Sequence, residues 1–340
     1  MSGGVDSSLA AAILKRASYE VSGVYMNLSS ATDPAKTVSD LEQVCRILNI
    51  PFYQVNFEAE FKDMVIDYFC REYSQGRTPN PCTVCNQHIK FGLLLDKVRE
   101  MGADYLATGH YARIEHLPTG YHLLKALDTG KDQSYFLYTL GQKELQHLLM
   151  PLGLLSKAEV REIAAELGLP TSSRSDSQDV CFIPGNDYRS FIARHITLQP
   201  GDIVDTEGNI LGKHKGLARY TVGQKQGLGL NSSERRYVLK LNYQNNRLVV
   251  GSEEQLYHNA LTAGKLSWVS GQAPRKPINI TAKVRYRSPE ANARLNIKGE
   301  ITGVQFAQPQ RAIAPGQAIA FYRGDEVLGG GIIESTEDVI

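Results

Sequence analysis

Three of the five cysteines have a spacing that could support chemistry. Cys82 and Cys85 form a CxxC in the turn-rich segment TPNPCTVCN, and Cys181 is the only cysteine that follows them. A lone CxxC fits half of a zinc site, a redox pair, a set of cluster ligands or two packed thiols. Zinc needs further ligands, and no second CxxC or close Cys/His pair follows. Cys45 and Cys70 lie within helical patterns, so we predict that they are core residues.

A glycine turn at the start of the chain is the second candidate site. The motif SGGVDS, residues 2–7, leads directly into the alanine-rich helical stretch 9–16. Its glycines let backbone amides approach phosphate oxygens, its serines add hydroxyl donors, and the helix dipole favours negative charge. The motif lacks the lysine of a Walker loop, and an ordinary capped turn is the alternative. We interpret it as a phosphate-binding loop.

Alternating strand and helix patterns in the first half of the chain must position these residues. Residues 21–26, 52–56 and 105–109 are typical of strands, whereas 34–48 and 89–101 have apolar residues at helical spacing. Ser156 and Glu159 form a capping-box signature before a helix whose apolar face includes Val160 and Ala164. The alternation predicts an α/β domain with a parallel sheet, which we place at residues 1–185.

The second half of the chain is dominated by short strand patterns. The helical signal fades after about Pro184, and residues 201–251 are rich in glycine turns, so we expect a small β-rich central domain at 186–255. Strand patterns at 278–287, 293–297, 303–306 and 318–322 then predict an antiparallel β-barrel at 256–340.

The charge balance says little about partners, but its distribution is uneven. The 340 residues carry a net charge of +1, yet residues 211–251 contain eight basic residues and only one acidic residue, Glu234. This stretch would attract phosphates. No apolar run approaches the roughly 18–20 residues that cross a bilayer, and no secretory signal precedes the first motif, so we expect a cytoplasmic protein.

Six motifs in order give the chain a resemblance to a known family. SGGVDS, TPNPCTVCNQHIKF, ATGHYAR, KDQSYFLY, SQDVCFI and VRYRSPE resemble the bacterial tRNA-specific 2-thiouridylases, over essentially the whole chain. The resemblance implies a PP-loop ATP pyrophosphatase domain, a small central domain and a C-terminal β-barrel. It also implies an ATP-dependent sulfurtransferase that forms 2-thiouridine at the anticodon wobble position.

The resemblance further implies a mechanism and partners. ATP, with Mg²⁺, adenylates the C2 oxygen of the uridine, and a persulfide on Cys181 supplies the sulfur. Cys85 is the nucleophile that releases the sulfur and can close a transient disulfide with Cys181. The implied partners are tRNAs for Lys, Glu and Gln, together with a cysteine desulfurase or sulfur-relay protein.

Matching the family position by position implies two further sets of residues. ATP would be bound by Ser2, Gly3, Gly4, Val5, Asp6, Ser7, Met26 and Gly109. The target base and the tRNA would be contacted by Asn80, Pro81, Cys82, His110, Lys131, Asp132, Gln133, Arg285, Tyr286 and Gln317.

The chain departs from the family pattern in two places. Family members commonly read NPDxxC, so Cys82 replaces an aspartate, and Cys82, Cys85 and Cys181 could instead hold an iron–sulfur cluster. In PP-loop enzymes a hydrophobic strand precedes the SGG turn, whereas only Met1 precedes it here. A chain start set too late would explain this difference, and we prefer that interpretation to the loss of a strand that would weaken ATP binding.

Two other functions remain open on the sequence. Another PP-loop ligase that adenylates a small molecule would need neither Cys85 nor Cys181. A catalytically impaired RNA-binding homologue would show no affinity for ATP.

Overall fold

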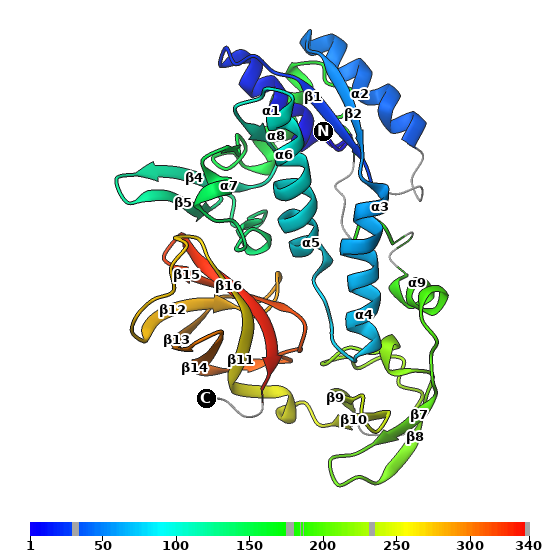
Figure 1. The fold of residues 1–340 in the computed structure, drawn as a ribbon. Helices are drawn as coiled ribbons and strands as arrows, with labels where there is room; N and C mark the ends of the chain where they lie inside the picture. The colour runs from blue at the N-terminus through cyan, green and yellow to red at the C-terminus, as the bar shows by residue number, and fades with distance from the viewer. Residues whose placement is uncertain (29–33, 175–179, 184, 186, 231–234, 337–340) are drawn as a thin grey trace.

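Two parallel strands and the helix between them form one end of the molecule. The computed structural model describes residues 1–28, 34–174, 180–183, 185, 187–230 and 235–336. Strand β1 (Gly23–Asn27) pairs in parallel with β2 (Phe52–Asn56), and α2 (Pro34–Leu48) is the crossover that parallel pairing requires (Figure 1). The predicted bounds of α2 and β2 are confirmed, whereas β1 begins two residues after the predicted Val21.

Helices α1 (Val5–Arg16) and α8 (Lys157–Glu166) pack against each other through one hydrophobic cluster. Leu9 of α1 and Val160 of α8 are both fully buried in it. The predicted capping box is confirmed, because the Ser156 hydroxyl accepts from the Glu159 amide at 3.2 Å and the Glu159 carboxylate accepts from the Ser156 amide at 2.7 Å. The cap fixes where α8 begins, beside the glycine turn.

Two long helical runs lie side by side below this end of the molecule (Figure 1). The first comprises α3 (Glu58–Phe61), the π-helix η1 (Lys62–Asp67) and α4 (Tyr68–Ser74). The second comprises α5 (Pro81–Val84), the π-helix η2 (Cys85–Leu94) and α6 (Leu95–Glu100). The second run begins eight residues before the predicted helix, because Asn80 caps it by accepting from the Thr83 amide at 3.3 Å and Pro81 suits its first position.

The remaining elements of the first 195 residues are short. They are β3 (Leu106–Ala107), β4 (Ala112–Leu117), β5 (Gly120–Lys125), the 3₁₀-helix η3 (Ser134–Phe136), α7 (Gln142–Leu145), β6 (Leu148–Leu149) and α9 (Tyr188–His195). The predicted strand at 105–109 is only two residues long and pairs in parallel with β6. The expectation that helices end near Pro184 is wrong, because Asp187 caps α9 by accepting from the Ser190 amide at 3.0 Å.

The central domain is a four-stranded sheet in the order β8-β7-β10-β9. Its elements are β7 (Gly201–Val204), β8 (Ile210–His214), β9 (Tyr237–Asn242) and β10 (Arg247–Gly251), with the 3₁₀-helices η5 (Leu217–Arg219) and η6 (Glu254–Leu256). Ile203, Val238 and Leu248 form its small apolar core. This confirms the expected β-rich character.

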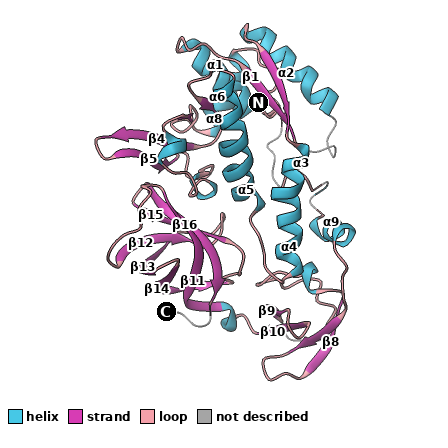
Figure 2. Cartoon of the chain, viewed as in Figure 1, coloured by secondary structure: helices cyan, strands magenta, loops and turns pink. Residues whose placement is uncertain are grey.

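Six antiparallel strands close into the C-terminal barrel (Figure 2). They are β11 (Tyr257–Trp268), β12 (Ile278–Lys283), β13 (Ala291–Lys298), β14 (Ile301–Arg311), β15 (Ala318–Arg323) and β16 (Glu326–Ser335). Pairing of β11 with both β14 and β16 closes the barrel. The predicted strand at 278–287 ends earlier, at Lys283, and the sequence patterns did not predict β11 and β16.

The barrel shares a hydrophobic core with the N-terminal domain. Tyr135 is fully buried in one cluster with Tyr322 of the barrel, and its hydroxyl donates to the Ala318 carbonyl at 2.7 Å. Strand β5 also joins the barrel sheet, where Leu124 lies opposite Glu326. These contacts hold the two parts together as one body.

A second contact, which we call the barrel clamp, holds residues 77–79. They lie just before the helical run of α5, η2 and α6, which carries Cys82 and Cys85 and which we call the cysteine helix. The Arg77 guanidinium binds Glu72 at 2.8 Å and Glu334 of the barrel at 2.7 Å. The Thr78 amide donates to the Pro315 carbonyl at 2.8 Å, and the Gln317 side-chain amide donates to the Thr78 carbonyl at 3.0 Å. The barrel therefore fixes the point from which the chain enters α5.

No helix in the described part of the chain combines the length and apolar character needed to cross a membrane.

Replacing Arg77 tests the barrel clamp. In Arg77→Ala the Glu72 carboxylate, whose side chain is 9% exposed, loses its cation, and an unpaired buried charge costs about 3 kcal/mol. Urea denaturation should show a loss of that size. The matched control is Lys97→Ala, which breaks the exposed Lys97–Glu100 pair and should change stability by less than about 0.5 kcal/mol. Equal small losses in both variants would contradict a structural role for the clamp.

Candidate active site

The SGGVDS turn leads into the start of α1, as the prediction of a phosphate-binding loop requires. Gly3 has φ +81°, a conformation that favours glycine, and Gly4 is the N-cap residue with extended backbone. Gly4 has no side chain with which to cap the first amides of α1. The Ser2 amide donates to the Ser7 hydroxyl at 3.1 Å, and that hydroxyl donates to the Gly4 carbonyl at 3.2 Å. The closed turn leaves a helix N-terminus suited to phosphate oxygens.

Gly109 packs directly against this turn. A Cβ at position 109 would lie 2.7 Å from the Asp6 carbonyl carbon and 2.8 Å from the Ser7 amide nitrogen. Only glycine fits there without displacing the first turn of α1. The predicted nucleotide residue Gly109 is therefore in backbone contact with the loop itself.

Three side chains from distant parts of the chain converge on the loop, and the sequence patterns predicted none of them. Lys157 binds both carboxylate oxygens of Asp6, at 2.6 and 2.9 Å, and the Tyr111 hydroxyl donates to Asp6 at 2.8 Å. Arg174 donates to the Gly3 carbonyl at 2.6 Å and also binds Asp40. Lys157 immediately follows the Ser156 cap, so the capping box was the one local signal that could have placed it.

The predicted adenine contact, Met26, lies near the carboxyl end of β1. It is half-buried and packs against two core clusters. The next residue, Asn27, has a buried side-chain carbonyl oxygen that finds no hydrogen-bond donor among the described residues. Ligands bind at the carboxyl ends of parallel strands, and an unsatisfied acceptor there fits a donor such as an amino group. The edge of the sheet is thus compatible with a nucleotide base.

The three candidate cysteines differ in exposure. Cys85 is buried at the start of η2, Cys82 is half-buried, and Cys181 is exposed. Burial raises the pKa of Cys85 to about 12, and it also raises the pKa of Cys82. The pKa of Cys181 is raised as well, because neighbouring protein partly desolvates its sulfur although the residue as a whole is exposed. Cys45 and Cys70 are buried, as predicted for core residues.

Lys90 is the cation that opposes this effect of burial on the thiols. Its positive charge favours the thiolates and lowers the pKa of Cys82, Cys85 and Cys181. It is half-buried on η2, and the wide turn of a π-helix places residues five apart, such as Cys85 and Lys90, on one face. The sequence patterns did not place Lys90 in the site, because an α-helix with 3.6 residues per turn would put it on a different face from Cys85.

His110 connects the loop to the cysteine helix. It follows Gly109, its Nδ1 lies 2.8 Å from the Thr108 hydroxyl, and its ring contacts Phe91 of η2 at 5.6 Å between centroids. Burial, followed by the charge of Lys90, holds the pKa of His110 well below its ordinary value. A neutral imidazole is therefore expected there at physiological pH.

The structure does not bring the cysteines together as a metal site. Among the residues that it describes, which include Cys82, Cys85 and Cys181, no three His, Cys, Asp or Glu side chains could hold a metal ion. Their arrangement does not fit an iron–sulfur cluster. The preceding residues Ser177, Gln178 and Asp179 of the SQDVCFI motif lie outside the described residues.

Several of the predicted RNA contacts have structural partners. Asn80 caps α5, and Pro81 is buried. Asp132 is buried and accepts from the Ala126 amide at 3.0 Å and from the Ser134 hydroxyl at 2.8 Å. The Gln133 side-chain carbonyl accepts from the Tyr111 amide at 3.0 Å. These bonds fix the KDQ loop, in which Lys131 is half-buried.

Two of the three predicted barrel residues, Tyr286 and Gln317, contact the N-terminal domain. Tyr286 packs its ring on Phe136 at 4.5 Å between centroids, and the Arg285 amide donates to the Ser288 hydroxyl at 3.3 Å. The Gln317 side-chain amide is part of the barrel clamp. Tyr286 and Gln317 therefore also hold the barrel on the domain that carries the cysteines.

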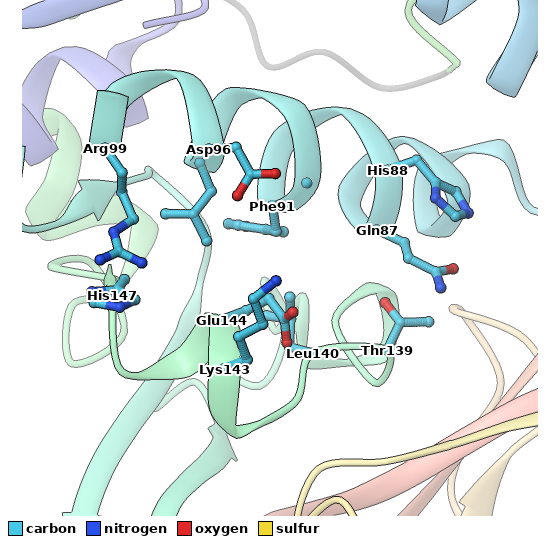
Figure 3. A pocket seen from close by; sticks show the side chains of 12 residues that line it. Gln87, His88, Phe91, Asp96, Arg99, Thr139, Leu140, Lys143, Glu144 and His147 are labelled. Carbon is cyan, nitrogen blue, oxygen red and sulfur yellow. The ribbon is translucent and has the colours of Figure 1, made fainter. Parts of the chain in front are cut away.

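A cavity of about 260 Å³ lies between η2, α6 and the segment around α7. Figure 3 shows Arg99 near His147 at one end, and Gln87 opposite Thr139 at the other. Phe91, which contacts His110, lines it, but none of the predicted site residues does. The cavity therefore lies between the cysteine helix and residues 139–147, and it is separate from the predicted site.

Comparison with known proteins covers nearly the whole chain. Residues 1–185 match the tRNA methyl transferase HUP domain, 189–252 the tRNA methyl transferase PRC-barrel domain and 258–333 the aminomethyltransferase beta-barrel domain. The tRNA-specific 2-thiouridylase MnmA of Moorella thermoacetica is 46% identical over 355 residues, covering 100% of this chain and 99% of that protein. The chain belongs to the tRNA-specific 2-thiouridylase family.

Other relatives in the same family have similar coverage. The protein of the same name from Clostridium kluyveri is 45% identical over 349 residues, with 98% of each chain covered. That of Chloroflexus aurantiacus is 46% identical over 350 residues, covering 99% of this chain and 98% of its own. The resemblance drawn from the six motifs is confirmed, as is the fold class of a PP-loop domain, a small central domain and a barrel.

The pH dependence of thiol reactivity tests Lys90. The positive charge of Lys90 lowers the pKa of Cys181, so Lys90→Gln should raise that pKa. The pH profile of Cys181 alkylation should then move to higher pH. At pH 7.5 the reaction should be severalfold slower, as measured by mass spectrometry with iodoacetamide. The control is Lys97→Gln in α6, an exposed lysine that should leave the profile unchanged. Coincident profiles for all three proteins would contradict a role for Lys90.

Proposed function

We propose that this chain is an ATP-dependent sulfurtransferase that converts an anticodon wobble uridine of tRNA into 2-thiouridine. The observation that carries the proposal is the continuity between the two candidate centres. Gly109 contacts the phosphate-type loop and its neighbour His110 contacts the cysteine helix, so a nucleotide and a thiol can serve one substrate. The full-length relatives named as tRNA-specific 2-thiouridylases support the same conclusion.

In the first step the C2 oxygen of uridine attacks the α-phosphorus of ATP. The bond from that phosphorus to the bridging oxygen breaks, and its electron pair leaves with pyrophosphate. The loop amides at the start of α1 favour the negative charge on the phosphates. AMP, now attached through the C2 oxygen, is a far better leaving group than the original oxygen.

In the second step the terminal sulfur of a persulfide on Cys181 attacks C2, and AMP leaves with the oxygen. Cys85, as thiolate, then attacks the Cys181 sulfur, breaks the persulfide S–S bond and leaves its electron pair on the sulfur of the base. This forms a Cys85–Cys181 disulfide, which an external thiol reductant must reopen. The exposure of Cys181 suits it to receive sulfur from a donor protein, whereas the buried Cys85 is shielded.

The remaining roles are part of the proposal. ATP, accompanied by Mg²⁺, is assigned to residues 2–7, Met26 and Gly109, and the target base to Asn80, Pro81, Cys82 and His110. Lys131, Arg285 and Tyr286 are assigned to RNA, and the basic stretch 211–251 to the tRNA body. The three segments 1–185, 186–255 and 256–340 are the proposed domains, and a cysteine desulfurase or sulfur-relay protein in the cytoplasm is the proposed donor. We include no iron–sulfur cluster, because the three cysteines do not form a metal-holding group.

Nucleoside mass spectrometry tests this function. Unmodified tRNAs for Lys, Glu and Gln are incubated with the protein, ATP, Mg²⁺ and a cysteine-desulfurase sulfur donor under reducing conditions. 2-Thiouridine should appear with the wild type and fall at least about 100-fold in Cys85→Ala and Cys181→Ala, since each removes a covalent step. Cys45→Ala, which removes a core thiol, is the control and should retain activity.

Two other results would indicate a different function for this chain. Adenylation of a small molecule that persists in both cysteine variants would indicate another PP-loop ligase. tRNA binding without any ATP affinity would indicate an RNA-binding homologue.

Substitution of Gly109 tests the ATP assignment. In Gly109→Ala the new methyl group collides with the Asp6 and Ser7 backbone, so the start of α1 must move and ATP affinity should fall about tenfold or more. Isothermal titration with ATP and Mg²⁺ measures it. Gly130→Ala is the matched control, because its nearest neighbour is the Asp128 side chain at 3.3 Å. Unchanged ATP affinity in Gly109→Ala would refute this nucleotide site.

A further inference from the structure

The glycine loop lacks its own lysine, but a lysine from another helix reaches it. Lys157 is the first residue of α8, 150 positions after the loop, and its ammonium binds Asp6 at 2.6 and 2.9 Å. Its side chain is only 12% exposed. A lysine this buried needs an acidic partner, and Asp6 is that partner in the nucleotide-free protein.

We propose that Lys157 is a pyrophosphate-binding residue of this loop, and that Asp6 holds it in place until the nucleotide binds. The inference rests on the proposed function for the identity of the substrate. It adds a residue that is outside the SGGVDS motif and that the loop's own sequence does not supply.

The geometry around Lys157 favours a phosphate ligand. The N-termini of α1 and α8 meet at the loop, because the first residues of both helices contact Asp6 or belong to its turn. The positive end of α1, which no side chain caps, adds to the charge of the ammonium, whereas the first amide of α8 already donates to the Asp128 carboxylate at 3.0 Å. Tyr111 shapes the same spot, with its hydroxyl on Asp6 and its ring 5.6 Å from the Lys157 ammonium.

Charge balance explains why a lysine is needed here. Breaking the bond to the α-phosphorus places negative charge on the departing pyrophosphate. Amide dipoles alone provide partial charges, whereas a lysine provides a full one in a site with low dielectric constant. In the nucleotide-free protein Asp6 satisfies that cation, and without this carboxylate a buried ammonium would be costly.

A phosphate group can replace the Asp6 carboxylate as the partner of the Lys157 ammonium. Asp6 and a phosphate group compete for the same ammonium, so phosphate binding must replace the Asp6–Lys157 pair or share it. An Asp6 released in this way is free to serve Mg²⁺, whose preferred ligands are oxygens. The ion pair thus prepares both groups for the nucleotide.

Titration of the full chain with inorganic pyrophosphate and with AMP, each by calorimetry, tests the proposal. Lys157→Gln should bind pyrophosphate at least about tenfold more weakly than the wild type and bind AMP equally well, because AMP lacks the β- and γ-phosphates. Lys157→Arg should retain most of the affinity. Lys143→Gln, an exposed lysine of α7, is the control.

A second experiment predicts a gain of affinity for pyrophosphate, which a misfolded variant would not show. In magnesium-free buffer Asp6→Asn removes the competing carboxylate, so pyrophosphate should bind severalfold more tightly. The proposal is overturned if Lys157→Gln binds pyrophosphate as the wild type does, or if it loses AMP to the same extent, which would indicate a structural role. These titrations need no tRNA or sulfur, so a wild type that binds both ligands but makes no 2-thiouridine would refute the thiolation function alone.

Discussion

The barrel clamp is the contact on which the rest of the site depends. Arg77 and Thr78 are held by Glu334 and Pro315 of the barrel, far later in the chain, and the Asn80 cap starts the cysteine helix from that fixed point. The position of Cys85 is then set by the helix, and that of Lys90 by the π-helical turn. A barrel that packs differently would move the thiols relative to the glycine loop, so the domains act as one catalytic unit.

Opposing electrostatic effects meet at the cysteines. Burial favours the neutral thiol of Cys85, whereas the charge of Lys90 favours the thiolate. The loop presents the same kind of balance, with Asp6 against Lys157 and Arg174 against Asp40. At the loop the paired charges lie where the proposed nucleotide phosphates would bind, so substrate binding would have to replace or share these ion pairs.

The sequence predicted features whose cause is local. The glycine turn, α2, β2 and the Ser156 capping box depend on residues a few positions apart, and the six motifs identified the family and the three-part fold. Contacts between distant segments were missed: Lys157 at the loop, Lys90 among the thiols and Gln317 on Thr78. Asp132 also has a buried structural role that a polar KDQ loop did not indicate. Spacing cannot show which distant side chains fill a site, because tertiary packing decides it.

The barrel clamp can form only late in the synthesis of the chain. Chains emerge from the ribosome with the N-terminus first, and domains generally fold in that order. The glycine loop and the cysteine segment leave the ribosome long before Pro315 and Glu334 exist to hold them. Until residues 315–334 have been made, Arg77 and Thr78 lack their barrel partners, so the start of the cysteine helix is not yet fixed.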